Sequence, residues 1–155
     1  MTKTNLMNKL KLQIRKKENC EDLPLPKYMS QNSSGMDLYA DVDSEISLAP
    51  GEIRLVSAGI YISLPEGYEA QIRPRSGLAI KYGIGIVNSP GTIDADYRGL
   101  INIILINFGK TPYVIKRGMR IAQMVINKVT QVDLEVVDEL DSTDRNTGGF
   151  GHTGV

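Results

Sequence analysis

The chain consists largely of short runs in which apolar and polar residues alternate. In residues 9–17, leucine and isoleucine alternate with lysine, glutamine and arginine, which is the period of two of a strand with one apolar face. Similar runs recur at intervals of roughly 8–12 residues, the spacing typical of an all-β barrel or sandwich. Residues 76–82 are expected to form a single helical turn. The expected strands are 9–17, 45–48, 52–57, 59–64, 68–73, 84–88, 100–107, 112–116 and 121–132.

Two of these runs differ from half-solvated strands. Residues 100–106 and 124–126 are apolar at nearly every position, so both faces of each strand need cover. Aromatic residues make up 6% of the chain and tryptophan is absent, so we expect a small barrel to leave part of this surface uncovered. Contact with another subunit is the simplest way to bury this apolar surface.

Composition excludes several function classes. Eighteen lysine and arginine residues balance eighteen aspartate and glutamate residues, so no excess positive charge favours a nucleic-acid partner. With one cysteine, Cys20, and one histidine, His152, neither a disulfide within the chain nor a zinc site of histidine and cysteine ligands can form. The base of an enzyme built on this chain is therefore expected to be a carboxylate.

The ends of the chain suggest location and assembly. No apolar run reaches the roughly 18 residues of a membrane helix, and the N-terminus lacks the apolar core of a signal peptide, so we expect a cytoplasmic protein without a membrane partner. Residues 1–17 carry six basic and no acidic residues, whereas residues 133–144 carry six acidic and no basic residues. In a monomer both ends are solvated; in an oligomer they favour contact between subunits.

Two polar segments are candidates for chemistry. In residues 73–77, Arg-Pro-Arg-Ser-Gly, the proline fixes a turn, the glycine lets the backbone approach a ligand, and arginine and serine can donate to phosphate oxygens. In residues 92–99, Asp94 and Asp96 are expected to share a face beside the most apolar strand, where a carboxylate could orient a water. The residues alone favour plainer readings for both segments, a turn before a short helix and a solvated hairpin.

The C-terminal residues 145–154 combine glycines with an arginine, hydroxyl groups and one aromatic ring, Phe150. This composition suits a flap that closes on an anionic ligand with a flat ring. A frayed terminus is an equally good reading of these residues.

Five segments together resemble, in order and spacing, the five motifs of the homotrimeric dUTP pyrophosphatases. The resemblance covers the chain from about Leu10 to its end, and five motifs in register are far more specific than any one of them. The segments are Gly35 to Ala40, Pro74 to Leu78, Gly91 to Gly99, Arg120 to Met124 and Arg145 to Gly154.

This resemblance implies a fold, an assembly and an activity. The expected fold is an all-β, jelly-roll-like distorted β-barrel with one short helix, formed by residues 1–137, followed by a flexible arm, 138–155, that carries the flap. Three active sites would lie at the interfaces of a homotrimer. With Mg²⁺, they would hydrolyse dUTP to dUMP and diphosphate, which limits uracil incorporation into DNA and supplies dUMP for thymidylate synthesis.

The resemblance also assigns roles to residues around the nucleoside. Asp94 resembles the aspartate that positions the attacking water and meets the sugar 3′-hydroxyl, and Tyr97 the ring packed under the deoxyribose. Asn88 and the hairpin backbone from Gly99 to Asn102 resemble the elements that read uracil, and Thr92 and Ile93 belong to the same substrate-binding hairpin.

Around the phosphates, Arg75, Ser76, the Gly77 backbone and Gln123 resemble phosphate contacts. Asp37 resembles an acid that reaches Mg²⁺ through water, without a direct protein ligand. Arg145 and Phe150 resemble the flap residues that grip the γ-phosphate and cover the base.

The chain departs from the family pattern at three positions, and two rival functions stay open. Asn146 stands where the family usually has glycine, His152 where it usually has serine and Ser34 where it often has alanine. The rival in the same fold is a dCTP deaminase-like enzyme, which needs an additional glutamate that no motif here demands. The rival from another class is a regulatory protein that binds a nucleotide without turning it over.

Overall fold

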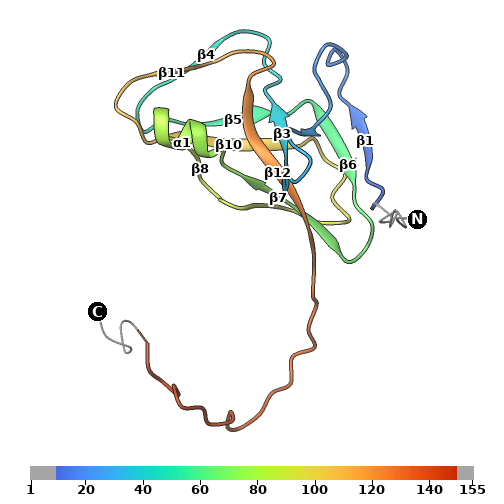
Figure 1. The fold of residues 1–155 in the computed structure, drawn as a ribbon, viewed down its shortest axis with the longest axis vertical. Helices are drawn as coiled ribbons and strands as arrows, with labels where there is room; N and C mark the ends of the chain where they lie inside the picture. The colour runs from blue at the N-terminus through green and yellow to red at the C-terminus, as the bar shows by residue number, and fades with distance from the viewer. Residues whose placement is uncertain (1–9, 150–155) are drawn as a thin grey trace, which may run out of the picture.

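Strands dominate residues 10–149, the part of the chain that the computed structural model describes (Figure 1). Within this range the structure has twelve strands and one short helix, which confirms the expected mostly-β fold. The elements are β1 (Gln13–Lys16), β2 (Lys27–Tyr28), β3 (Gly35–Tyr39), β4 (Ile46–Leu48), β5 (Ile53–Ser57), β6 (Ile60–Ser63), β7 (Tyr68–Arg73), α1 (Ser76–Tyr82), β8 (Ile84–Ile86), β9 (Gly91–Ile93), β10 (Asn102–Asn107), β11 (Tyr113–Ile115) and β12 (Arg120–Lys128).

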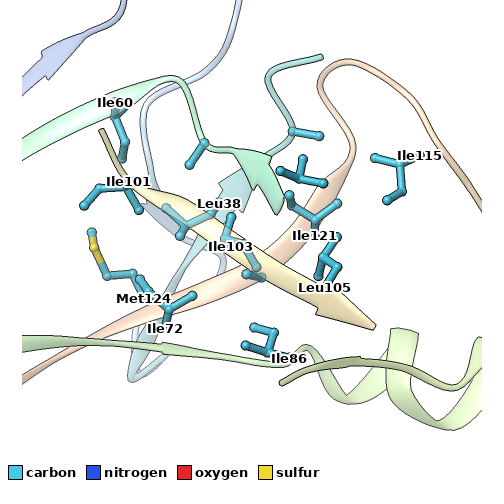
Figure 2. Close-up of a cluster of buried hydrophobic side chains, with 14 of the residues drawn as sticks. Leu38, Ile60, Ile72, Ile86, Ile101, Ile103, Leu105, Ile115, Ile121 and Met124 are labelled. Carbon is cyan, nitrogen blue, oxygen red and sulfur yellow. The ribbon is translucent and has the colours of Figure 1, made fainter. Parts of the chain in front are cut away.

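The strands form antiparallel sheets around one apolar core. The largest sheet has the order β2-β3-β12-β7-β9, the next has the order β5-β10-β8, and β1-β6 and β11-β4 form two further pairs. Inward side chains from the two larger sheets meet in the centre, where Leu38, Met124, Ile103 and Leu105 are almost fully buried (Figure 2). Successive residues of a strand face opposite sides. The residues between these buried positions therefore point away from the core, towards the outer surface.

The observed elements refine the sequence prediction in several places. Residues 68–73 form β7 as expected, whereas the expected strands 9–17 and 121–132 shorten to β1 and β12. The expected helical turn is a seven-residue helix, which ends at Gly83 in the left-handed conformation, with φ of 70°. A Cβ at Gly83 would also approach the backbone nitrogen of Gly109 to 2.6 Å. Both the left-handed backbone conformation and this close approach therefore require glycine at position 83.

The two strongly apolar runs are covered in different ways. In β12, Met124 and Val125 are both buried within the chain itself, so this strand needs no partner to cover its second face. In β10 the inner positions are buried, but the outer-facing Ile104 pairs with Leu55, which is 61% exposed. The expectation of an uncovered apolar face therefore applies to β10 and its neighbours, not to β12.

A buried carboxylate anchors the N-terminal part of the described chain. The two oxygens of Asp41 contact Lys17 Nζ at 2.7 Å and an Arg117 guanidinium nitrogen at 2.8 Å. Burial alone would raise the pKa of Asp41, but hydrogen bonds from Lys17, Cys20 and Arg117 outweigh it and hold this pKa well below its usual range. The cluster contains none of the candidate site residues, and its role is to fix residues 13–23 to the barrel.

Candidate functional site

One group of candidate residues lies where β7 runs into α1. Ser76 and Gln123 line a cavity of about 450 Å³ there. The Gln123 carboxamide donates from Nε2 to the Pro74 carbonyl oxygen at 2.9 Å, and a Cβ at Gly35 would collide with this carboxamide. The glycine on β3 therefore makes room for a side chain on β12, and the expected phosphate contacts Ser76 and Gln123 are neighbours in space.

Asp37 is held between two guanidinium groups at the same end of the sheet. Its Oδ1 lies 3.3 Å from Arg75 Nε and its Oδ2 lies 3.0 Å from a terminal nitrogen of Arg120. Glycine and aspartate are common turn formers, but Gly35 and Asp37 lie in the strand β3, which is paired on both sides. The carboxylate expected near Mg²⁺ thus lies beside the expected phosphate contact Arg75.

A second group of candidate residues lies in the segment that follows β9. Asp94 and Asp96 both line a cavity of about 730 Å³, together with Arg98 and residues of the β6–β7 loop. The two carboxylates therefore face the same cavity, as expected. They do so from a turn and not from a strand, because β9 ends at Ile93. Asp94 is exposed, so a solvent water can reach its carboxylate.

Glycines shape the hairpin around this carboxylate. A Cβ at Gly99 would collide with the Tyr97 ring, and a Cβ at Gly91 would lie 3.2 Å from the Asn88 carboxamide. The Tyr97 hydroxyl donates to the Leu100 carbonyl oxygen at 3.2 Å. These contacts hold the tyrosine ring and the asparagine side chain close to the backbone of the hairpin, where both are exposed to solvent.

The two groups of residues are separated along β7. Ile93, which precedes Asp94, pairs with Ala70, whereas Gln123 pairs with Arg73. A strand rises ~3.3 Å per residue, so these two pairs are roughly 10 Å apart, and β9 runs away from the end that carries Gln123. Within one chain, the expected base is therefore not next to the expected phosphate contacts.

The described part of the C-terminal arm lies away from both groups. After β12 the chain leaves the barrel as an extended segment (Figure 1). There Arg145 donates from Nε to the Gly148 carbonyl oxygen at 2.8 Å. Asn146 has φ of 41°, and asparagine tolerates this left-handed region better than most residues other than glycine. Phe150 and His152 lie outside the described residues.

Two further polar residues line the first cavity: Arg73, which begins the candidate segment 73–77, and Gln71, which the sequence analysis did not single out. Arg73 and Gln71 join Ser76 and Gln123 there, and the Arg73 guanidinium donates to Gln71 Oε1. The signal was present, because polar residues at 69, 71 and 73 alternate with apolar ones along β7.

The described residues hold neither a cluster of metal-ligating side chains nor a helix suited to a membrane. In residues 10–149, no group of three or more histidine, cysteine, aspartate and glutamate side chains is arranged to hold a metal ion. No helix in that range is long and apolar enough to cross a membrane.

Comparison with known proteins gives consistent matches over nearly the whole chain. A sequence model of the dUTPase family matches residues 21–154. The deoxyuridine 5′-triphosphate nucleotidohydrolase of Caldanaerobacter subterraneus subsp. tengcongensis is 58% identical over 144 residues, which are 93% of this chain and 97% of that protein. The enzyme of the same name from Maricaulis maris is 54% identical over 96% of this chain and 99% of that protein.

Solved structures give the same picture. The dUTPase of Staphylococcus bacteriophage 80alpha in complex with dUpNHpp superposes with a TM-score of 0.84 at 26% identity, over 94% of this chain and 99% of that chain. A mutant dUTPase of phage phi11 of S. aureus, whose structure describes the coordination of a structural Mg(II) ion, superposes with a TM-score of 0.75 at 25% identity, over 85% and 99% of the two chains.

Proposed function

This chain belongs to the dUTPase family, and we propose that it hydrolyses dUTP to dUMP and diphosphate. The observation that carries the proposal is that the Ser76 hydroxyl and the Gln123 carboxamide line one cavity at the Pro74 turn, while the guanidinium of the adjacent Arg75 is held by Asp37. Such groups form charge-assisted hydrogen bonds to phosphate oxygens. The reaction limits uracil incorporation into DNA and supplies dUMP for thymidylate synthesis, and the cytoplasm is the location that fits this role.

Asp94 is the proposed catalytic residue. Its exposed carboxylate would hold a water in line with the scissile phosphate and accept the proton as the water attacks. An aspartate is a weak base near neutral pH, so orientation of the water contributes more than a matched pKa. The substrate 3′-hydroxyl would share the same carboxylate, which ties the sugar to the attacking water.

The hairpin around Asp94 would select the nucleoside. The ring of Tyr97, tied to the Leu100 carbonyl oxygen, would pack under the deoxyribose and leave no space for a 2′-hydroxyl. Asn88 and the backbone of the hairpin, from Thr92 and Ile93 to Gly99 and Asn102, would pair with uracil. A site that hydrogen-bonds its substrate in this way rejects a mispaired base such as cytosine by factors of the order of 10⁴.

The residues present fit a Mg²⁺ ion that the substrate itself brings. Asp37 is a carboxylate beside the expected phosphate contact Arg75, and triphosphate oxygens and waters supply most ligands of an ion bound in this way. Asp37 would reach such an ion through water. When bound, Mg²⁺ neutralises phosphate charge as the leaving diphosphate departs.

The proposed assembly is a homotrimer whose sites are shared between subunits. Asp94 and the phosphate contacts lie apart in one chain, so a second chain would bring them together. The outer face of the sheet β5-β10-β8 supplies an apolar surface for that contact, with Leu55, Ile104 and Val87 in one row across the strands. Exposed apolar area of this kind is typical of subunit interfaces.

Light scattering at micromolar concentration is expected to report about three chain masses. A Leu55→Glu variant should shift the protein towards monomers and lose turnover, because a charge at an apolar interface is costly. The matched control is Ile80→Glu, an exposed isoleucine on α1, which should stay trimeric. A monomeric parent chain with full turnover would rule out shared sites.

Product analysis with Mg²⁺ and each of dUTP, dCTP, dTTP and UTP tests the activity. We expect dUMP and diphosphate from dUTP, and turnover of the other three nucleotides that is lower by orders of magnitude, because each mismatches the base or the sugar contact. Ammonia released from dCTP would instead identify a deaminase. Tight binding of dUTP without product would identify a regulatory nucleotide-binding protein.

A further inference from the structure

A β-bulge in β12 turns Arg120 towards the candidate phosphate site. The pairing of β12 with β3 shifts by one residue between Arg120 and Ala122. Ile121 and Ala122 are both buried, at 1% and 0% exposure, although neighbouring residues of a regular strand face opposite sides. Without the bulge, Ile121 would share the outer face with Gln123. With the bulge, Arg120 takes that face, and bulges that re-aim a side chain are common beside functional sites.

Arg120 then contacts the expected phosphate-binding residue in two ways. Its guanidinium lies 3.0 Å from Asp37 Oδ2, and the other carboxylate oxygen of Asp37 lies 3.3 Å from Arg75 Nε. In addition, the Arg120 carbonyl oxygen accepts a hydrogen bond from a terminal nitrogen of Arg75 at 3.0 Å. The Asp37 side chain is only 11% exposed, whereas that of Arg120 is 42% exposed, so the carboxylate forms the fixed centre of the group.

We propose that Arg120 is a positioning residue for recognition of the triphosphate. It neutralises Asp37 and, through Asp37 and its own carbonyl oxygen, holds the Arg75 guanidinium in the orientation that meets the phosphates. Without the Arg120 charge, Arg75 is the remaining ion-pair partner of Asp37 among the described contacts. The positive charge of Arg75 is then neutralised by Asp37 and is less available to the phosphates of the substrate. The inference rests on the proposed function and concerns the phosphates of dUTP, not its nucleoside.

The first test is an Arg120→Gln variant of the full chain. We expect the Kd for dUpNHpp and the KM for dUTP to rise about tenfold, the loss of one charge-assisted contact, while kcat stays within about threefold. Inhibition by deoxyuridine, which carries no phosphate, should be unchanged. Arg120→Lys should recover part of the affinity, because it restores the charge but not the planar fork. Arg54→Gln is the matched control, since Arg54 is also an exposed strand arginine paired with a carboxylate, that of Glu52.

A double-mutant cycle tests whether Arg120 acts through Arg75. If it does, adding Arg120→Gln to Arg75→Gln should change the Kd for dUpNHpp less than about twofold. Independent, additive losses would overturn the proposal, as would an unchanged Kd in the single variant or an equal loss of deoxyuridine binding. If the parent chain binds dUpNHpp but does not hydrolyse dUTP, the proposed function fails while the cycle still decides the role of Arg120.

Discussion

An Asp94→Asn variant is expected to lose turnover of dUTP by about 10²–10⁴-fold, the usual contribution of a positioned acid or base. The amide keeps the size of the side chain but cannot accept the proton of the attacking water. Binding of dUpNHpp should stay within about tenfold of the parent chain, or ~1.4 kcal/mol, because the phosphate and base contacts lie on other residues. Steady-state kinetics and calorimetric titration measure the two effects separately.

Asp96→Asn is the matched control for this prediction. Asp96 lies two residues further along the same turn, is exposed, and lines the same cavity as Asp94. Its variant should keep turnover within a few-fold, because the proposed mechanism gives it no contact with the reacting atoms. Near-normal turnover of Asp94→Asn would remove Asp94 from its role, and equal losses in both variants would indicate general damage to the hairpin.

The sequence predicted those strands best in which alternation is uninterrupted. Residues 68–73 alternate polar and apolar side chains and form β7 with the expected bounds. The strand β3 was missed because Gly35 and Asp37 are local turn formers, whereas pairing with β2 and β12 imposes the extended conformation. Tertiary pairing overrides such local preferences, since strand propensity depends strongly on what lies next to the strand.

The candidate site was predictable as a set of residues, but its arrangement was not. The motifs placed Asp94 and Gln123 in one site, whereas their separation in the chain follows from which residues of β7 face β9 and β12. The turn of Arg120 towards Asp37 depends on a single extra residue in one strand. The hydrophobic pattern predicts neither the register nor the bulge, because two consecutive apolar residues such as Ile121 and Ala122 also occur where no bulge is present.

The ion pairs of the structure could not be predicted from the sequence either. Asp41 meets Lys17 and Arg117 across 24 and 76 positions of sequence, and the balanced composition gave no reason to single out any of the three. Their contact follows from the fold and cannot be inferred before it. For this reason the sequence identified chemistry-bearing segments, while the contacts that orient them come from the structure.

Deletion of residues 144–155 is expected to abolish most turnover while it leaves the barrel intact. The segment before it, residues 129–143, packs little against the barrel: Val132, Leu134 and Val136 are 72%, 90% and 97% exposed, and Arg145 is exposed as well. The described part of the deleted segment, residues 144–149, contributes little buried apolar area, so the melting temperature should change by no more than about 2 °C. Turnover should fall by about 100-fold or more, because the deletion removes both proposed flap residues, Arg145 and Phe150, and leaves the triphosphate open to water.

Single variants in the full chain separate the two proposed contributions of this segment. Arg145→Gln should raise the KM for dUTP about tenfold or more, because a guanidinium that pairs with the γ-phosphate is lost. Phe150→Ala should weaken binding through loss of stacking on uracil, by about 1 kcal/mol. Thr143→Ala, a change just outside the deleted segment, is the control and should match the parent chain. A truncated protein as active as the full chain would show that the segment is a spare terminus, and one that fails to fold would show that it belongs to the core.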